Sequence, residues 1–182
     1  IIVIEDNKPD AIELLKAKVA DCDNMEVFPA RTKYPQGAEK TLIKRVMGRV
    51  VPRGGLPADV GVVVSNISTV KAISDAIQKG MPLIERVATV TGEKIRKPGN
   101  FIVKIGTSVK ELIDYCGGTT DEDVLIKMGG PMMGFALSDV NVPMMKGSNG
   151  IIAIDTDKTE EMSCIKCGRC VDVCPMELSP LY

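Results

Sequence analysis

The chain has 182 residues, of which 45% are hydrophobic and 26% charged, a composition typical of soluble globular proteins. A formal net charge of −1 and an aromatic content of 3% argue against a nucleic-acid-binding surface, which needs basic patches or stacking rings. The lack of histidine excludes His-based acid–base chemistry and His metal ligation within this chain. No apolar run approaches the ~18 residues of a membrane span, and the apolar residues 1–4 lack the basic start of a signal peptide.

The first half of the chain alternates between strand and helix patterns. Three apolar runs predict strands, and the last of them is continuous enough to be covered on both faces: residues 1–4, 25–30 and 60–64. A helical pattern follows each run, and the second and third helices are expected to end at Gly48 and Gly80. We expect Ser68 to cap the third helix. This order predicts the α/β class, a three-layer unit with a mostly parallel sheet.

Short strands then replace the long helices. Strand-like runs at 87–91, where apolar and polar residues alternate, and at 101–105, 124–128 and 150–155 surround one short helix. The start of this helix is marked by a capping box from Ser108 to Glu111. We therefore expect the α/β unit to span residues 1–93 and a small α+β module to span 94–156. The remaining residues, 157–182, form a cysteine-rich segment.

Two loops are candidate ligand sites. Glu5 and Asn7 follow the first predicted strand, and Ser65 and Asn66 follow the third. In open α/β sheets ligands bind outside the carboxyl ends of the strands, and a helix N-terminus can hold a phosphate. Plain helix capping explains both loops equally well.

Other polar and glycine-rich stretches carry weaker signals. Residues 129–134 contain three glycines but neither a Walker nor a G-x-G-x-x-G pattern, so a tight turn is the better interpretation. A basic series lies along the second helix and its exit; such a series is usually a solvated face, with a nucleotide or docking role as the alternative. Its members are Lys40, Lys44, Arg45, Arg49 and Arg53.

The strongest motif is the cysteine run Cys164, Cys167, Cys170 and Cys174, followed by Pro175. Its spacing, C-x2-C-x2-C-x3-C-P, is that of bacterial ferredoxins, where the fourth cysteine ligates the other of two clusters. We expect the first three cysteines to hold one [4Fe–4S] cluster and Cys174 to belong to a second. A zinc site would use two separated ligand pairs, and a disulfide scaffold would be shorter and denser in cysteine. Reduced cysteines and an oxygen-sensitive cluster favour the cytoplasm.

Several stretches together resemble the C subunit of the Rnf ion-translocating electron transport complexes. They are residues 5–9, 30–40, 82–87, 129–134 and the cysteine run. The resemblance implies a flavin domain similar to that of the NADH-oxidising subunit of complex I, then a β-grasp-like SLBB module, then a segment for two [4Fe–4S] clusters.

The resemblance also implies cofactors and partners for the full-length protein. These are FMN and NADH, the other subunits of a membrane Rnf-type complex, and ferredoxin acting through that complex. The location implied is the cytoplasmic side of the cell membrane, as a peripheral subunit. Glu5, Asn7, Ser65 and Asn66 would be flavin-site walls. The family's upstream glycine-rich loop and second cysteine motif are absent from these residues, so we interpret the chain as a fragment that is inactive alone.

Two other functions compete with this one. A soluble flavin and iron–sulfur reductase of the same architecture, similar to cobalamin reductases, would not sediment with membranes. A non-catalytic docking module would use the cysteines for a structural metal, so zinc without iron or sulfide would favour it.

Overall fold

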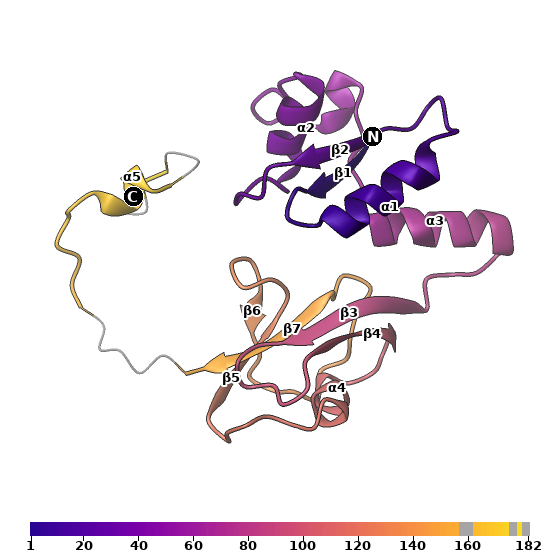
Figure 1. Cartoon of the computed structure of the whole chain (residues 1–182). Helices are drawn as coiled ribbons and strands as arrows, with labels where there is room; N and C mark the ends of the chain where they lie inside the picture. The colour runs from indigo at the N-terminus through magenta and orange to yellow at the C-terminus, as the bar shows by residue number, and fades with distance from the viewer. Residues whose placement is uncertain (157–161, 175–177, 180–182) are drawn as a thin grey trace. The chain divides into compact units, whose positions relative to one another are not determined.

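The structure is a computed structural model that describes residues 1–156, 162–174 and 178–179. The chain divides into two compact units, one formed by residues 1–64 with 163–182 and the other by residues 65–162 (Figure 1). Each unit is described by itself. Among the described residues, no helix is both long enough and apolar enough to cross a membrane.

The first unit is built on a two-stranded parallel sheet. Strand β1 (Ile2–Glu5) pairs with β2 (Val27–Ala30). Helix α1 (Pro9–Val19) connects the two strands and begins with a proline, whose missing N–H would be unpaired in the first turn anyway. Helix α2 (Glu39–Met47) follows and ends at Gly48 as predicted, in the left-handed conformation that glycine adopts without strain. The α/β class is therefore confirmed.

The strand predicted at residues 60–64 is wrong. The 3₁₀ turn η1 (Pro57–Val60) occupies the start of this run, and Gly61 then adopts a left-handed φ of 68°. The Val62 N–H donates to the Pro57 carbonyl at 3.1 Å, so the run bonds locally instead of to a sheet neighbour. Val63 is 84% exposed, which shows that the apolar run is not buried on both faces.

The second unit contains helix α3 (Ile67–Lys79) and a five-stranded sheet in the order β4-β3-β7-β5-β6. Only the β3–β7 pair is parallel, and the other neighbours are antiparallel. The short helix α4 (Val109–Tyr115) begins at Ser108, whose hydroxyl accepts a 3.1 Å hydrogen bond from the Glu111 N–H as the capping motif predicted. The strands are β3 (Glu85–Thr91), β4 (Gly99–Lys104), β5 (Val124–Met128), β6 (Phe135–Ala136) and β7 (Gly150–Asp155).

The predicted boundary at residue 93 is also wrong. Strand β3 pairs with β4 over residues 85–90 and with β7 over residues 89–91, so one sheet continues through both segments that the boundary was meant to separate. The boundary between the two units lies instead between residues 64 and 65, just before α3. Alternating periodicity identified β3 as a strand, but pairing between distant residues decides which sheet a strand joins.

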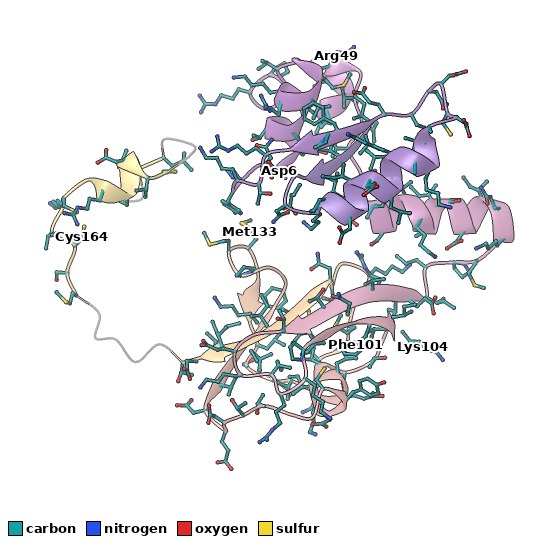
Figure 2. All side chains as sticks on the ribbon, in the orientation of Figure 1. Asp6, Arg49, Phe101, Lys104, Met133 and Cys164 are labelled. Atoms are coloured by element: carbon teal, nitrogen blue, oxygen red, sulfur yellow. The ribbon has the colours of Figure 1, made fainter. Side chains whose placement is uncertain are left out.

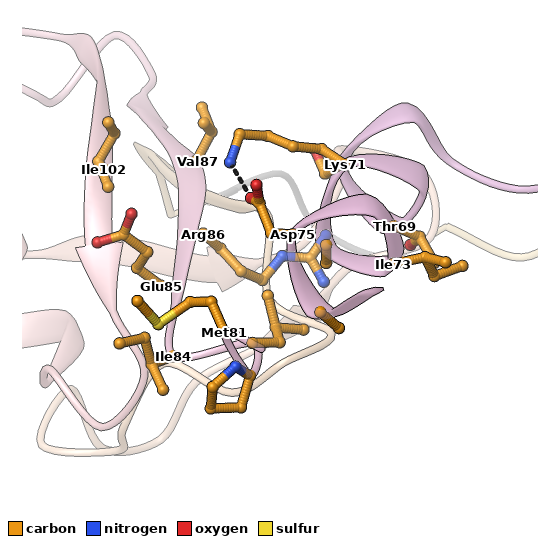
Figure 3. Close-up of a pocket in the computed structure, with 15 residues that line it drawn as sticks. Thr69, Lys71, Ile73, Asp75, Met81, Ile84, Glu85, Arg86, Val87 and Ile102 are labelled. Atoms are coloured by element: carbon orange, nitrogen blue, oxygen red, sulfur yellow. Dashed lines mark hydrogen bonds and ion pairs between the residues drawn. The ribbon is translucent and has the colours of Figure 1, made fainter. Parts of the chain in front are cut away.

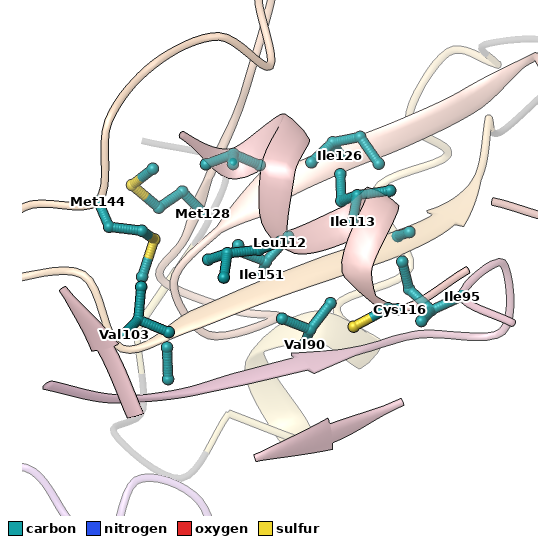
Figure 4. Packing of buried hydrophobic residues seen from close by; sticks show 13 residues of the cluster. Val90, Ile95, Val103, Leu112, Ile113, Cys116, Ile126, Met128, Met144 and Ile151 are labelled. Carbon is teal, nitrogen blue, oxygen red and sulfur yellow. The ribbon is translucent and has the colours of Figure 1, made fainter. Parts of the chain in front are cut away.

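The main hydrophobic core lies in this second unit (Figure 4). Val90 and Ile151, from the neighbouring strands β3 and β7, are fully buried against α4, as is Cys116. Burial away from water raises the pKa of the Cys116 thiol, which is the behaviour of a structural cysteine rather than a reactive one. Met144 is also a core residue, whereas Met132 and Met133 in the 129–134 turn are exposed.

Candidate functional site

A hydrogen-bonded link joins the carboxyl ends of β1 and β2. The Asp6 carboxylate accepts hydrogen bonds from the Thr32 backbone N–H at 2.9 Å and from the Thr32 hydroxyl at 2.8 Å. The Asp6 N–H donates to the Ala30 carbonyl at 2.8 Å. The Thr32 hydroxyl, then its N–H, lower the pKa of the Asp6 carboxyl, so Asp6 is ionised at neutral pH. The two loops are therefore held together where ligands of parallel sheets bind.

The two predicted site residues of this loop lie on either side of Asp6. Glu5 forms an ion pair with Lys8, three residues later, and the Lys8 N–H donates to the Glu5 carbonyl at 3.2 Å. Asn7 is exposed in the turn before α1. Both side chains are therefore reachable by a ligand, and the hydrogen-bonded Asp6 (Figure 2) lies between them in the sequence.

Ser65 and Asn66 open the second unit. Asn66 caps α3, since its side-chain oxygen accepts a 2.9 Å hydrogen bond from the Ser68 N–H. The cap predicted at Ser68 is therefore two residues too late. The Asn66 amide retains its N–H donors, and Ser65 is exposed beside it. This pair offers hydroxyl and amide groups next to a helix N-terminus, where a phosphate is favoured.

A groove of about 450 Å³ lies between α3 and the β3–β4 hairpin (Figure 3). Its lining is mainly apolar and includes Ile73, Ile84 and Ile102, with the Lys71–Asp75 ion pair at its edge. None of the four predicted flavin residues lines it. The groove is therefore a feature separate from the loops at which the sequence predicts the flavin site.

The four cysteines of the motif lie on one short segment around α5 (Arg169–Asp172). Gly168 caps this helix in the left-handed conformation, with φ of 77°, and Lys166 also has a positive φ of 56°. These conformations turn the chain tightly between successive cysteines. Cys164 (Figure 2), Cys167 and Cys170 are exposed and Cys174 is half-buried, and none of the four is in a disulfide.

The local backbone of this segment suits iron–sulfur ligation. The Lys166 N–H donates to the Cys164 sulfur at 3.3 Å, and the Leu178 N–H donates to the Cys174 sulfur at 3.4 Å. Hydrogen bonds to sulfur stabilise cluster thiolates and tune their potential. The described side chains do not converge as three or more ligands around one point. The four cysteines nevertheless fit a [4Fe–4S] cluster, because cysteine thiolates closely spaced along one loop are the ligands that such clusters use.

Comparison with known families gives three matching segments, in the order that the sequence predicted: a flavin domain, an SLBB module and a cluster segment. Residues 1–75 match the Nuo51 FMN-binding domain, residues 87–136 match the SLBB domain, and residues 154–177 match the 4Fe-4S binding domain. The chain thus falls in the class of proteins that combine a Nuo51 FMN-binding domain, an SLBB domain and a 4Fe-4S binding segment. The SLBB match begins inside β3, in agreement with the sheet and not with the predicted boundary.

The relatives identify the family within that class. The chain is 54% identical over 97% of its length to the C subunit of the proton-translocating ferredoxin:NAD(+) oxidoreductase complex of Clostridium ljungdahlii, and covers 39% of that protein. It is 44% identical over 99% of its length to the C subunit of the Na(+)-translocating ferredoxin:NAD(+) oxidoreductase complex of Acetobacterium woodii, of which it covers 41%. For the C subunit of the ion-translocating oxidoreductase complex of Rhodobacter capsulatus the identity is 45% over 98% of the chain and 35% of the relative. The chain belongs to this family of C subunits, and it spans about two fifths of the length of these relatives.

Thr32, in the loop after β2, is a residue of the candidate site that no sequence motif indicated. It lies within the stretch 30–40 that carried the family resemblance, but no local pattern indicates that its hydroxyl contacts a carboxylate 26 residues away. The one available signal for this contact is the position of the two residues: Asp6 follows the first predicted strand and Thr32 follows the second.

Proposed function

We propose that the protein containing this chain is the electron-transfer subunit of a membrane-associated, ion-translocating complex, passing electrons between NADH, a flavin and [4Fe–4S] clusters. The observation that carries this proposal is the succession, within one chain, of a flavin-type segment and a ferredoxin-type cysteine run. A flavin takes two electrons from NADH and can release them singly, while each cluster carries one. NADH and FMN as cofactors, ferredoxin and the other subunits as partners, and the cytoplasmic membrane face as location all belong to the proposal.

The residue roles follow from the chemistry of each loop. Glu5, Asn7, Ser65 and Asn66 are the proposed flavin-binding residues: Glu5 and Asn7 offer a carboxylate and an amide, and Ser65 and Asn66 offer a hydroxyl and an amide. Cys164, Cys167 and Cys170 would ligate one cluster and Cys174 the second. Residues 1–182 lack a phosphate-cradling glycine loop, so we expect this chain alone to bind flavin and NADH weakly and to be inactive.

Anaerobic reconstitution of the full-length protein tests the proposal. The expected result is bound flavin, about eight iron atoms per chain for two cubanes, and NADH oxidation with an artificial acceptor. Zinc without iron or sulfide would contradict it and support a docking module. Sedimentation with membranes separates the membrane-associated subunit from a soluble, cobalamin-reductase-like enzyme.

Variants of single cysteines test the cluster assignment. Cys174→Ser should remove the signal of one cluster and keep that of the other, and Cys22→Ser is the matched control, because Cys22 lies outside the motif. If a full-length protein with Cys174→Ser retained both clusters, or lost the cluster assigned to the first three cysteines, the assignment of Cys174 would be wrong.

A further inference from the structure

The groove between α3 and the β3–β4 hairpin has the size and the lining of a ligand site. Its volume of about 450 Å³ falls within the range of roughly 300–1,000 Å³ that is typical of small-molecule sites. Apolar side chains reach it from α3, from the connection to β3 and from β4, among them Ile73, Met81, Ile84 and Ile102 (Figure 3). Each of these four residues is between 48% and 72% exposed, so the groove presents apolar surface to solvent.

An unpaired cation lies in this apolar lining. Arg86 is half-buried, and its guanidinium extends toward α3 (Figure 3). The Arg86 Nε is shielded from water without a hydrogen-bond partner, and the side chain makes no ion pair with the described residues. A polar or charged group that is shielded from water costs free energy unless it is paired, and such groups are normally paired in proteins. Arg86 therefore lacks an anionic partner.

The acidic side chains of the lining do not supply this partner. One oxygen of the Asp75 carboxylate accepts a hydrogen bond from Lys71 at 2.5 Å, and the other accepts one from Lys79 at 2.7 Å. The two lysines lower the pKa of Asp75 to about 2, so this carboxylate stays ionised and bound to them at neutral pH. Glu85 is exposed and makes no ion pair with Arg86. The guanidinium is thus left to a molecule that enters the groove.

We propose that the groove binds a small molecule that combines an apolar body with a single carboxylate. A guanidinium offers two parallel N–H donors, which match the two oxygens of a carboxylate. The apolar body would remove the exposed lining from water, which is favourable in proportion to the area covered. A group with two negative charges is disfavoured, because Asp75 and Glu85 place two carboxylates in the same lining and Lys71 is already paired.

This ligand differs from those of the proposed electron-transfer reaction. FMN and NADH carry phosphates, which the two carboxylates of the lining disfavour. The proposed flavin residues Glu5, Asn7, Ser65 and Asn66 do not line the groove. The site therefore does not rest on the proposed function, and its ligand can be tested without any measurement of electron transfer.

Isothermal titration of the full-length protein tests the proposal, with decanoate as the probe. Decanol supplies the same chain without the charge, and acetate and inorganic phosphate are anions without a chain. Decanoate should bind saturably. Decanol should bind at least about tenfold more weakly, because it lacks the charge-assisted hydrogen bonds to the guanidinium. Acetate and phosphate should show no binding at the concentrations that saturate the protein with decanoate, and phosphate that bound as tightly as decanoate would contradict the proposed ligand class.

Substitutions of Arg86 separate its charge from its bulk. Arg86→Met keeps a long apolar side chain, so it should weaken decanoate binding at least about tenfold and change decanol binding less than about twofold. Arg86→Lys should give an intermediate affinity for decanoate, because an ammonium lacks the two parallel donors. Arg45→Met is the matched control, because Arg45 on α2 is exposed and has no hydrogen bond or ion pair with the described residues. This control should bind decanoate as the parent protein does.

Filling the groove is an independent test that leaves Arg86 in place. Ala76→Phe adds a ring at an exposed position of α3 that lines the groove, so it should abolish binding of both decanoate and decanol without lowering the unfolding temperature. Equal decanoate affinities of the parent protein and Arg86→Met, or of the parent protein and Ala76→Phe, would overturn the proposal. So would the absence of saturable decanoate binding by the parent protein, which is the result expected if another part of the full-length polypeptide covers the groove.

Discussion

The Asp6 carboxylate and Thr32 join two loops that are 26 residues apart in the sequence. This contact joins the two loops at the carboxyl end of the β1–β2 sheet. It therefore holds in place the loop from which the exposed side chains of Glu5 and Asn7 could contact a ligand. A charged acceptor makes the hydrogen bonds stronger than neutral ones, and this is why the pKa of Asp6 is lowered.

The Asp6–Thr32 link predicts an acid-dependent contribution to stability. Because the pKa of Asp6 is lower in the folded state, its contribution is present above the unfolded value near 3.8 and is lost as the pH falls through the folded value. Thr32→Val removes the hydroxyl donor and should lower the unfolding temperature at neutral pH by roughly a few degrees. Thermal unfolding of both proteins from pH 7 to pH 2 should show the difference shrinking in acid. Thr32→Ser, which keeps the hydroxyl, is the control; a pH-independent difference would contradict the prediction.

Gly92 directly follows β3 and lies against the backbone of Ala153 in β7. A Cβ at this residue would lie 2.0 Å from the Ala153 carbonyl oxygen, and its φ is +116°. Gly92→Ala should therefore destabilise the second unit by about 3–5 kcal/mol, through both the clash and the backbone conformation. Gly106 is the control, because its φ is +99° but its Cβ would meet nothing within 4 Å. Urea unfolding should give a cost of only about 1–2 kcal/mol for Gly106→Ala; equal costs would show that the clash is relieved.

Ile151 lies at the centre of the core and has no exposed surface. Ile151→Ala removes buried methyl groups and leaves a cavity, which should cost about 2–5 kcal/mol. Ile102→Ala changes the same side chain at a position that is 72% exposed, on β4, and should cost less than about 1 kcal/mol. Urea unfolding of the two variants checks the difference, and similar midpoints would contradict the packing described.

Gly168 allows the cysteine loop to turn. Its φ is 77°, and a Cβ would meet no atom within 4 Å, so Gly168→Ala introduces backbone strain without a clash. Strain of about 1–2 kcal/mol should reduce iron uptake at limiting iron several-fold. The control Arg169→Ala keeps the glycine. Iron and sulfide assays after anaerobic reconstitution compare the variants; equal iron content at limiting iron would show that the turn is not needed.

Local patterns in the sequence predicted local structure well. The strand β5 at residues 124–128, the left-handed stop at Gly48 and the cap at Ser108 all depend on residues within a few positions of one another. The cysteine spacing likewise identified its family without any long-range information.

The features that sequence reasoning missed depend on distant contacts. An apolar run at residues 60–64 predicts a strand, but Arg49 holds the Val60 carbonyl and Gly61 turns the chain, so no sheet neighbour is reached. Strand β3 was recognised, but its parallel pairing with β7, from Thr89 with Gly150 onward, was not. The Asp6–Thr32 contact was missed for the same reason, since neither residue carries a signal of the other.

The position of β7 in the sheet also sets an order of maturation. It lies between β3 and β5, so the β3–β4 hairpin and the β5–β6 hairpin have no common core until Ile151 and Ala153 have left the ribosome. The cysteine motif begins at Cys164, shortly after β7 ends at Asp155. Late pairing of distant strands is slow compared with closing a hairpin. We expect ribosome-bound chains that end before β7 to be cleaved rapidly by protease, and chains in which β7 has emerged from the ribosome to resist cleavage. The cluster would then assemble after the second unit has folded.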